Sequence, residues 1–185
     1  CVPSGQTACA IAVAKSPLVV AGGAVFRRVF DLIAPGEVRF DAELADGEES
    51  VGQKQVIWRL EGPAKVLLMG ERTALNFVQR MSGTATLARR CVRALPEGSK
   101  TRIADTRKTT PGLRYLERYA VRTGGAHNHR DQLGSAVMIK DNHIVAAGGI
   151  GAAVACARAR APHTSSIEVE VTSLAELDEA VSAGA

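Results

Sequence analysis

The chain has 185 residues, of which 46% are hydrophobic and 23% charged, and its formal net charge at pH 7 is +4. This composition is typical of an ordinary soluble globular protein with a buried core. No apolar run reaches the roughly 20 residues that a bilayer requires, and the start, CVPSGQTACA, lacks the pattern of a secretory signal, so we expect a cytoplasmic protein without a membrane partner.

The cysteines and aromatic residues further limit the cellular compartment and the classes of binding partner that we expect. The four cysteines are scattered and form no C-x-x-C pair, which favours free thiols in a reducing compartment. A positive net charge can indicate nucleic-acid binding, but aromatic residues make up only 4% of the chain and form no stacking platform. We therefore expect small anions, and no nucleic acid, as partners.

The N-terminal part of the chain predicts a small α+β unit. Ala8 to Val13 is a short apolar run typical of a strand. After Gly22-Gly23, the residues Val25, Val29 and Ile33 recur every four positions, which indicates a helix.

The stretch from Asp31 to Ser50 is acidic, and we interpret it as a solvated strand-and-turn surface. Val56 to Leu60 then alternates as a strand does, and Glu61-Gly62-Pro63 is expected to end that strand.

A long helix is predicted next, because apolar residues recur by three and four over residues 75–95. The predicted stripe consists of Leu75, Val78, Met81, Ala85, Ala88, Val92 and Leu95. Glu71-Arg72 is expected at the start of this helix, where Arg72 does not suit the positive end of the dipole and so needs a partner elsewhere. Ser82-Gly83 lies in the middle of the helix, and close approach of another backbone would explain its glycine. Pro96-Glu97-Gly98 ends the helix and is the candidate domain boundary.

After this boundary, strand and helix patterns alternate. Strands are predicted at Ile103-Ala104, Ala136–Ile139 and Ile167–Val171, and they end near Thr106, Lys140 and Thr172, roughly 34 and 32 residues apart, as βα units do. Helices are predicted around residues 113–120 and 150–157, and Ser173-Leu174-Ala175-Glu176 is a capping box that opens a last helix with Leu174, Leu177, Ala180 and Val181 on one face. Parallel βα units bind ligands at the carboxyl ends of their strands.

The stretch from Lys100 to Lys140 is the strongest functional signal. It contains nine Lys or Arg residues and three acids, and the basic residues lie beside Thr, Gly, His and Asn rather than alternating with Glu at helical spacing. This pattern favours an anion-binding pocket. The strand ends would bring Arg107, Lys108, Lys140 and Glu170 to one face. Three such strands cannot close a barrel, so the chain is expected to be a segment of a longer one.

Five blocks in this order give the chain a resemblance to a known family. They are ERTALNFVQRMSG at residues 71–83, DTRKTTPGL at 105–113, GGAHNHR at 124–130, IKDNH at 139–143 and EVEV at 168–171. The sequence resembles the quinolinate phosphoribosyltransferases, the decarboxylating enzymes of de novo NAD synthesis. The resemblance implies an N-terminal α+β open sandwich, here residues 1–97, followed by a parallel α/β barrel of about six strands, of which residues 98–185 are a part that carries the active site.

The resemblance also implies the reaction and its partners. A phosphoribosyl group passes from 5-phosphoribosyl-1-pyrophosphate to quinolinate with decarboxylation, in an Mg²⁺-dependent reaction carried out by a homodimer. It implies that Arg107, His129 and Arg130 bind the quinolinate carboxylates, with Arg72 from the neighbouring subunit. Such carboxylates require cations with fork geometry.

The remaining site residues are assigned by the same resemblance. Lys108 and Lys140 would lie between the two substrates as catalytic residues, together with Glu170 near the ribose. Thr106 would contribute to substrate binding. No metal ligand is assigned on the chain itself, and His127 and His129 alone are a weak metal signal.

Several residues keep two interpretations at this point. Asp105 can be a structural residue that orients its loop or a catalytic one, and His143 can be a hydrogen-bonding residue at a strand end or part of the site. Glu168 and Glu170 share a strand face, so only the resemblance selects Glu170. The arginines at positions 114, 118 and 122 are interpreted as a solvated helix face.

The chain also departs from the family's pattern. Ala126 and Ser135 replace a usual glycine and a common acidic residue, and the alanine would be awkward at a positive φ. Both ends of the family's chain are missing, so the chain by itself is expected to be inactive. The alternatives are a nicotinate-type phosphoribosyltransferase, which needs one cation fewer, and an inactive anion-binding homologue.

Overall fold

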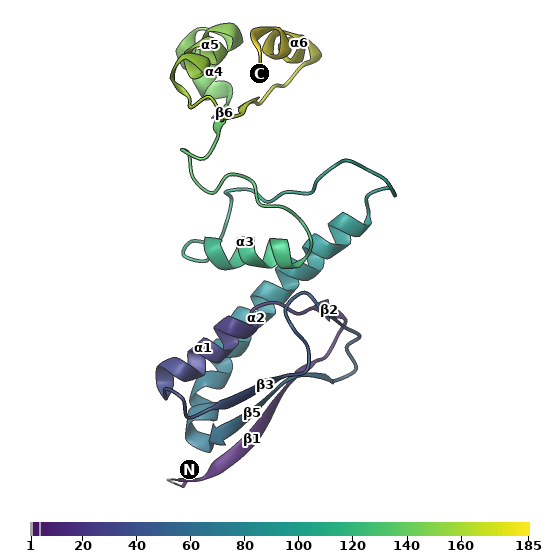
Figure 1. The fold of residues 1–185 in the computed structure, drawn as a ribbon, viewed down its shortest axis with the longest axis vertical. Helices are drawn as coiled ribbons and strands as arrows, with labels where there is room; N and C mark the ends of the chain where they lie inside the picture. The colour runs from purple at the N-terminus through teal and green to yellow at the C-terminus, as the bar shows by residue number, and fades with distance from the viewer. Residues whose placement is uncertain (1, 4) are drawn as a thin grey trace. The chain divides into compact units, whose positions relative to one another are not determined.

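The computed structural model describes residues 2–3 and 5–185, and the chain forms two compact units, residues 1–129 and 130–185 (Figure 1). The units divide later than the predicted boundary after residue 97, because α3 (Arg114–Thr123) packs on α2 (Ala64–Arg93) of the first unit. The assignment of domains 1–97 and 98–185 stays a prediction.

The first unit is built on an antiparallel sheet of order β1-β5-β3, made of β1 (Thr7–Ala14), β5 (Gln55–Pro63) and β3 (Arg39–Ala42). A second pair of strands joins β2 (Leu18–Val19) to β4 (Glu49–Ser50). The predicted strands at residues 8–13 and 56–60 are confirmed. The strand β5 continues through Pro63 instead of ending at Glu61, because Glu61 and Pro63 still pair with β1.

Helix α1 (Gly23–Ile33) follows the two glycines as predicted and packs on α2. Its buried side chains are Phe26 and Phe30, whereas Val25 and Val29 are only half-buried. The ring centroids of Phe26 and Trp58 lie 4.7 Å apart. The aromatic rings therefore form the core between α1 and the sheet.

Helix α2 begins at Ala64, directly after β5, and this corrects the expectation that Glu71 and Arg72 lie at its start. Both residues lie well inside the helix, so the dipole at its N-terminus does not act on them. The predicted stripe is confirmed at Val78, Met81 and its two alanines, which are buried. The periodicity alone could not locate the start because the first turns carry a different buried pair, Ala64 and Leu67.

The close backbone approach expected at Gly83 occurs elsewhere. A Cβ atom added at Gly83 would meet nothing within 4 Å among the described residues. The neighbouring Ser82 is the contact residue, since its hydroxyl accepts from Ala21 N at 3.1 Å. The close approach to α2 is at Gly124, where an added Cβ would lie 2.4 Å from the Ala85 carbonyl oxygen.

The second unit contains the parallel strands β6 (Val137–Ile139) and β7 (Ile167–Val169). Its helices are α4 (Asp141–Ala147), α5 (Ile150–Arg160) and α6 (Leu174–Ala183). Ile139, Ile150 and Val154 form its core with Ala180. Two of the three predicted parallel strands are thereby confirmed, whereas Ile103-Ala104 forms no strand and Ala104 makes only an isolated parallel bridge to His127.

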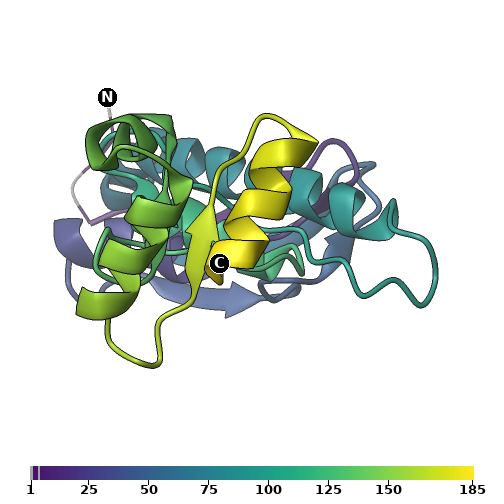
Figure 2. The same cartoon turned by 90° about the horizontal axis from the view of Figure 1, so that it is seen from above.

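The last helix has the predicted ends, and little of its apolar face is buried. The Ser173 hydroxyl accepts from Glu176 N at 3.2 Å, and Gly184 adopts a left-handed conformation at the C-terminus of α6. Figure 2 shows the chain running from β7 into this helix. Of the four residues predicted to share one face, only Ala180 is buried, and Leu174 is 79% exposed.

The observed classes of element agree with the predicted fold class, an antiparallel sheet unit followed by parallel βα units. None of the helices in the described part of the chain is long and apolar enough to cross a bilayer.

Candidate active site

Asp105 fixes the start of the cation-rich loop, residues 105–112, to the histidine segment, residues 127–130. Its carboxylate accepts from Asn128 Nδ2 at 2.6 Å, from His129 N at 2.7 Å and from Arg118 Nη1 at 3.3 Å. The Asp105 amide in turn donates to the His127 carbonyl at 3.0 Å. With a side chain only 7% exposed, Asp105 has the contacts of the structural residue, the first of its two interpretations.

Arg107 carries an unsatisfied donor. Its Nε atom is buried and has no hydrogen-bond partner among the described residues, while its carbonyl accepts from Arg114 Nη2 at 3.3 Å. Leaving a buried donor unpaired costs free energy. An anionic ligand at this guanidinium would remove that cost.

Thr106 and Lys108 line a cleft of about 230 Å³ within the first unit. The Thr106 hydroxyl accepts from Lys108 N at 3.0 Å, which holds the loop in a turn. The lining of the cleft consists of Arg80, Thr84, Asp105, Thr106, Lys108, Thr109, Glu117, Arg118 and Val121. The loop therefore presents one of the predicted cations, Lys108, to a polar cleft.

Glu117 holds the far side of the same loop. Its carboxylate accepts from Thr110 N at 3.1 Å, from the Thr110 hydroxyl at 2.7 Å and from Arg80 Nη2 at 2.5 Å. Burial raises the pKa of this carboxyl, but the hydrogen bonds from Arg80 and Thr110 outweigh burial, so that its pKa lies below the ordinary value of 4.5. Sequence reasoning missed both Glu117 and Arg80, although an isolated acid in a basic stretch is a signal for pairing.

The arginines of α3 correct an expectation. They were interpreted as a solvated face, but Arg118 is bound to Asp105 and donates to the His129 carbonyl at 2.9 Å. Arg114 donates to the Thr109 hydroxyl at 3.1 Å. The spacing of four could not reveal this, because the loops that cover the helix come from either side of it in sequence. Only Arg122 is exposed as predicted.

The histidine segment is positioned by its backbone. His129 binds Asp105 through its amide and Arg118 through its carbonyl, and Arg130 Nη1 donates to the Ala136 carbonyl at 3.2 Å. No cluster of three or more His, Cys, Asp or Glu that could hold a metal occurs among the described residues. Ala126 is buried without a positive φ, because the neighbouring Gly125 takes that conformation instead.

Lys140 and Glu170 form a pair at the carboxyl ends of the two parallel strands. Lys140 Nζ lies 2.5 Å from Glu170 Oε2, and Glu170 N donates to the Ile139 carbonyl at 2.9 Å. The two side chains are 43% and 59% exposed, so the pair contributes little to stability and both groups remain accessible to a ligand. The convergence of these two residues with Arg107 and Lys108 stays a prediction.

His143 is a hydrogen-bonding residue, which confirms one of its two interpretations. Its Nδ1 atom accepts from Lys140 N at 3.0 Å and caps the first turn of α4. Arg72, in contrast, is exposed on α2 and makes no hydrogen bond or ion pair with the described residues. Its expected role in a neighbouring subunit stays a prediction.

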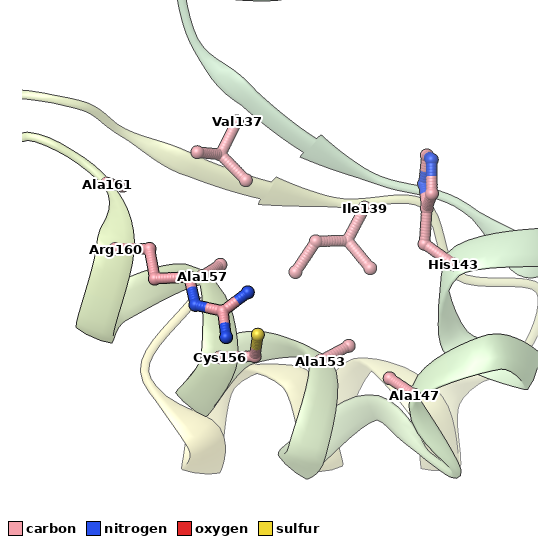
Figure 3. A pocket seen from close by; sticks show the side chains of 9 residues that line it. All are labelled: Val137, Ile139, His143, Ala147, Ala153, Cys156, Ala157, Arg160 and Ala161. Atoms are coloured by element: carbon pink, nitrogen blue, oxygen red, sulfur yellow. The ribbon is translucent and has the colours of Figure 1, made fainter.

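The second unit also contains an apolar cavity of about 420 Å³ (Figure 3). Val137 and Ile139 line it from the strand side, and Ala153 and Cys156 line it from α5. Among the residues considered for the site, His143 belongs to its lining, whereas Lys140 and Glu170 do not. Most of its lining is apolar, so it lacks the several cations that a dicarboxylate or pyrophosphate requires.

Comparison with known proteins assigns these loops to a family. The model of the quinolinate phosphoribosyl transferase C-terminal domain matches residues 84–185, and that of the N-terminal domain matches residues 1–82. The chain belongs to the quinolinate phosphoribosyl transferase family. The C-terminal domain of this family matches the part of the chain that contains the cation-rich loop, the histidine segment and both parallel strands.

Curated relatives of this family are similar over nearly the whole chain. The probable nicotinate-nucleotide pyrophosphorylase [carboxylating] of Bacillus subtilis is 47% identical over 98% of the chain, and the human nicotinate-nucleotide pyrophosphorylase [carboxylating] is 44% identical over 93%. The matched part is 62% of the first relative and 57% of the second. The chain therefore spans somewhat less than two thirds of the length of these relatives.

Solved structures of the family have the same fold. The crystal structure of NadC from Streptococcus pyogenes has a TM-score of 0.90 and 43% identity over 98% of the chain and 64% of that protein. The nicotinate-nucleotide pyrophosphorylase of Francisella tularensis has a TM-score of 0.91 and 36% identity over 97% of the chain and 63% of that protein. The predicted fold class is confirmed.

Proposed function

We propose that this protein transfers the phosphoribosyl group of 5-phosphoribosyl-1-pyrophosphate to quinolinate with loss of CO₂, giving nicotinate mononucleotide and pyrophosphate in de novo NAD biosynthesis. The observation that carries the proposal is Arg107, whose buried Nε has no partner among the described residues in a loop otherwise held by many hydrogen bonds. Its fork geometry matches a carboxylate. Membership of the family supplies the substrate class.

The chemistry requires the cations that the chain carries. The quinolinate ring nitrogen attacks C1 of the ribose while the bond to pyrophosphate breaks and its electron pair leaves with the pyrophosphate. Lys108 and Lys140 would neutralise that leaving group, and Glu170 would offset the positive charge that develops on the ribose. The carboxylate next to the pyridinium nitrogen then departs as CO₂ and leaves its bonding electron pair on the ring carbon. The positive ring nitrogen stabilises this carbanion, and a proton from water takes the place of the carboxylate. Positioning and electrostatics supply most of the rate.

Carboxylate binding is assigned to four cationic residues. Arg107, His129 and Arg130 would hold the two carboxylates of quinolinate, with Arg72 supplied by a second copy of the chain in a homodimer. The exposed position of Arg72 on α2 supports this arrangement. Light scattering of the purified protein tests the dimer. Mixing Arg72→Ala with Arg107→Ala tests whether the two copies share sites. A mixed dimer of these two variants regains one intact site, and with it activity.

Magnesium enters the proposal as an ion bound to the pyrophosphate of the substrate. No residue cluster in the described chain has the ligands of a resident metal site. A cytoplasmic location is proposed for a pathway enzyme of this kind, and the exposed free thiols of Cys9, Cys91 and Cys156 suit a reducing compartment.

The test is a direct assay of the protein with quinolinate, 5-phosphoribosyl-1-pyrophosphate and Mg²⁺. We expect nicotinate mononucleotide and CO₂ in equal amounts, and loss of both products when the metal is chelated. Product formation from nicotinate without CO₂ would instead support the nicotinate-type enzyme. Binding of quinolinate without turnover would support the anion-binding homologue. The intact mass of the sample identifies the polypeptide assayed.

A further inference from the structure

The loop that carries Arg107 and Lys108 is connected to α2 by side chains outside the predicted site. Arg80 lies on α2, Glu117 on α3 and Thr110 in the loop, and each of the three contacts the other two. Arg80 Nη2 is 2.7 Å from the Thr110 hydroxyl, and that hydroxyl is 2.7 Å from Glu117 Oε1. These three residues form a closed cluster, which we call the loop anchor.

The loop anchor binds the backbone of the loop as well as a side chain. The second carboxylate oxygen of Glu117 accepts from Thr110 N at 3.1 Å. The Glu117 side chain is 12% exposed, so its charge is partly desolvated and depends on these donors. Without Glu117, the Thr110 amide would lose its partner, and the loop would lose its attachment on the side opposite Asp105.

Arg80 and Glu117, two residues of the loop anchor, line the same cleft as Lys108. We propose that Glu117 and Arg80 are positioning residues that hold the loop so that Arg107 and Lys108 stand in binding geometry. They act through Thr110 and do not touch the substrate. The expected effect on quinolinate binding rests on the proposed function, whereas the expected effect on the loop does not.

The experiment measures amide hydrogen exchange of residues 105–112 in the full chain. We expect Glu117→Gln and Arg80→Gln to raise the exchange rate of this segment by at least about tenfold, with far-UV circular dichroism unchanged. Arg93→Gln is the matched control, because Arg93 also lies on α2 and pairs with an acid, Glu49, without contacting the loop. Thr110→Val should accelerate exchange of this segment, whereas Thr110→Ser, which keeps the hydroxyl, should exchange as slowly as the unmodified protein.

Quinolinate binding, measured by calorimetry on the same proteins, gives the second readout. We expect Glu117→Gln to weaken binding at least about fivefold and Thr110→Ser to restore the affinity that Thr110→Val loses. If exchange of residues 105–112 is unchanged in the folded Glu117→Gln and Arg80→Gln proteins, the proposal is overturned. Equal quinolinate affinity despite a loosened loop also overturns it.

The two proposals fail in different ways. If the unmodified chain does not bind quinolinate, the proposed function fails for this chain, and the exchange rates still decide whether Glu117 and Arg80 position the loop. If Glu117→Gln does not fold, Arg80→Gln and the two Thr110 variants decide, since the Arg80 side chain is 56% exposed and serine keeps the hydroxyl of Thr110.

Discussion

Asp105 receives three hydrogen bonds on a carboxylate that is almost fully buried. Two of its donors are neutral, and the third is the guanidinium of Arg118. Asp105 differs from a surface acid because its donors are shielded from solvent. When the carboxylate is removed, no water takes its place as their acceptor. The residue therefore determines how the cation-rich loop and the histidine segment lie against each other.

Removing this carboxylate should destabilise the protein strongly. Asp105→Ala removes the carboxylate that pairs with the largely buried guanidinium of Arg118, and we expect the free energy of unfolding to fall by about 3 kcal/mol. Asp41→Ala is the control, since Asp41 pairs with Arg39 on the surface with a 53% exposed side chain and should cost less than about 1 kcal/mol. Urea unfolding measures both, and equal losses would contradict the assigned role of Asp105.

Arg107 should contribute to ligand affinity rather than to folding. We expect Arg107→Ala to weaken quinolinate binding at least about tenfold, or 1.4 kcal/mol. Its unfolding free energy should not fall, since the variant removes an unsatisfied buried donor. Calorimetry with quinolinate measures the first quantity, and Arg59→Ala, a surface arginine of β5, is the control. Unchanged binding would remove Arg107 from the site.

At the scale of elements, α3 holds the loops on both of its sides. Arg114 and Glu117 bind the loop before the helix, and Arg118 binds the segment after it. The helix packs on α2 through Ala120 and Leu116, with Met81 and Ala85 on the α2 side. Its position therefore sets the position of both loops.

The loop anchor predicts that the stability of the protein depends on pH through Glu117. Because the pKa of Glu117 is lower in the folded protein than its ordinary value of 4.5, its ionised form stabilises the fold. The contribution is complete above pH 4.5 and is lost as the pH falls through the lower, folded value. The difference in unfolding free energy between the parent and Glu117→Gln should be constant near neutral pH and shrink in acid. Exposed Glu97→Gln serves as the control, and a difference that grows in acid would refute the prediction.

Gly83 within α2 and Gly124 at the end of α3 should respond in opposite directions to alanine. At Gly124 the added Cβ would lie 2.4 Å from the Ala85 carbonyl oxygen and 2.7 Å from the Ala88 Cβ, so we expect Gly124→Ala to cost about 1–3 kcal/mol. At Gly83, where an added Cβ meets nothing within 4 Å in the described chain, alanine should stabilise α2 by up to about 1 kcal/mol. Thermal unfolding of the two variants tests the signs.

At the scale of the whole molecule, the chain consists of two compact units joined near residue 130. Each has its own hydrophobic core, around Phe26 and Trp58 in the first and around Ile139 and Val154 in the second. The residues that follow the junction, 131–135, are all exposed, and Leu133 is 68% exposed.

This organisation predicts where a protease cuts first. Chymotrypsin should cleave the native protein after Leu133, because exposed loop tips are preferred sites, and release fragments 1–133 and 134–185. Mass spectrometry of a short digestion identifies the fragments. Leu133→Ala should slow this cleavage, whereas first cleavage after Trp58, which is 1% exposed, would contradict the division into units.

Much of the fold could be predicted because it depends on local rules. A short apolar run located β1, alternation located β5, the capping residues located α6, and the βα spacing indicated that β6 and β7 are parallel. The order of residue types around DTRKTTPG also identified the family, and it predicts that this stretch binds anions. These features lie within short segments, so neighbouring residues in the sequence contain the necessary information.

The tertiary structure decided which side chains serve as partners, because those contacts join segments that are distant along the chain. Sequence patterns could not choose between the two interpretations of Asp105, nor show that Arg118 is bound rather than solvated. Arg80 and Glu117 are separated by 37 residues and lie in different helices, so no periodicity connects them. The sequence by itself determined the residue types that predict an anion site, whereas packing of α3 on α2 determined how the first unit holds the loop that carries Arg107 and Lys108.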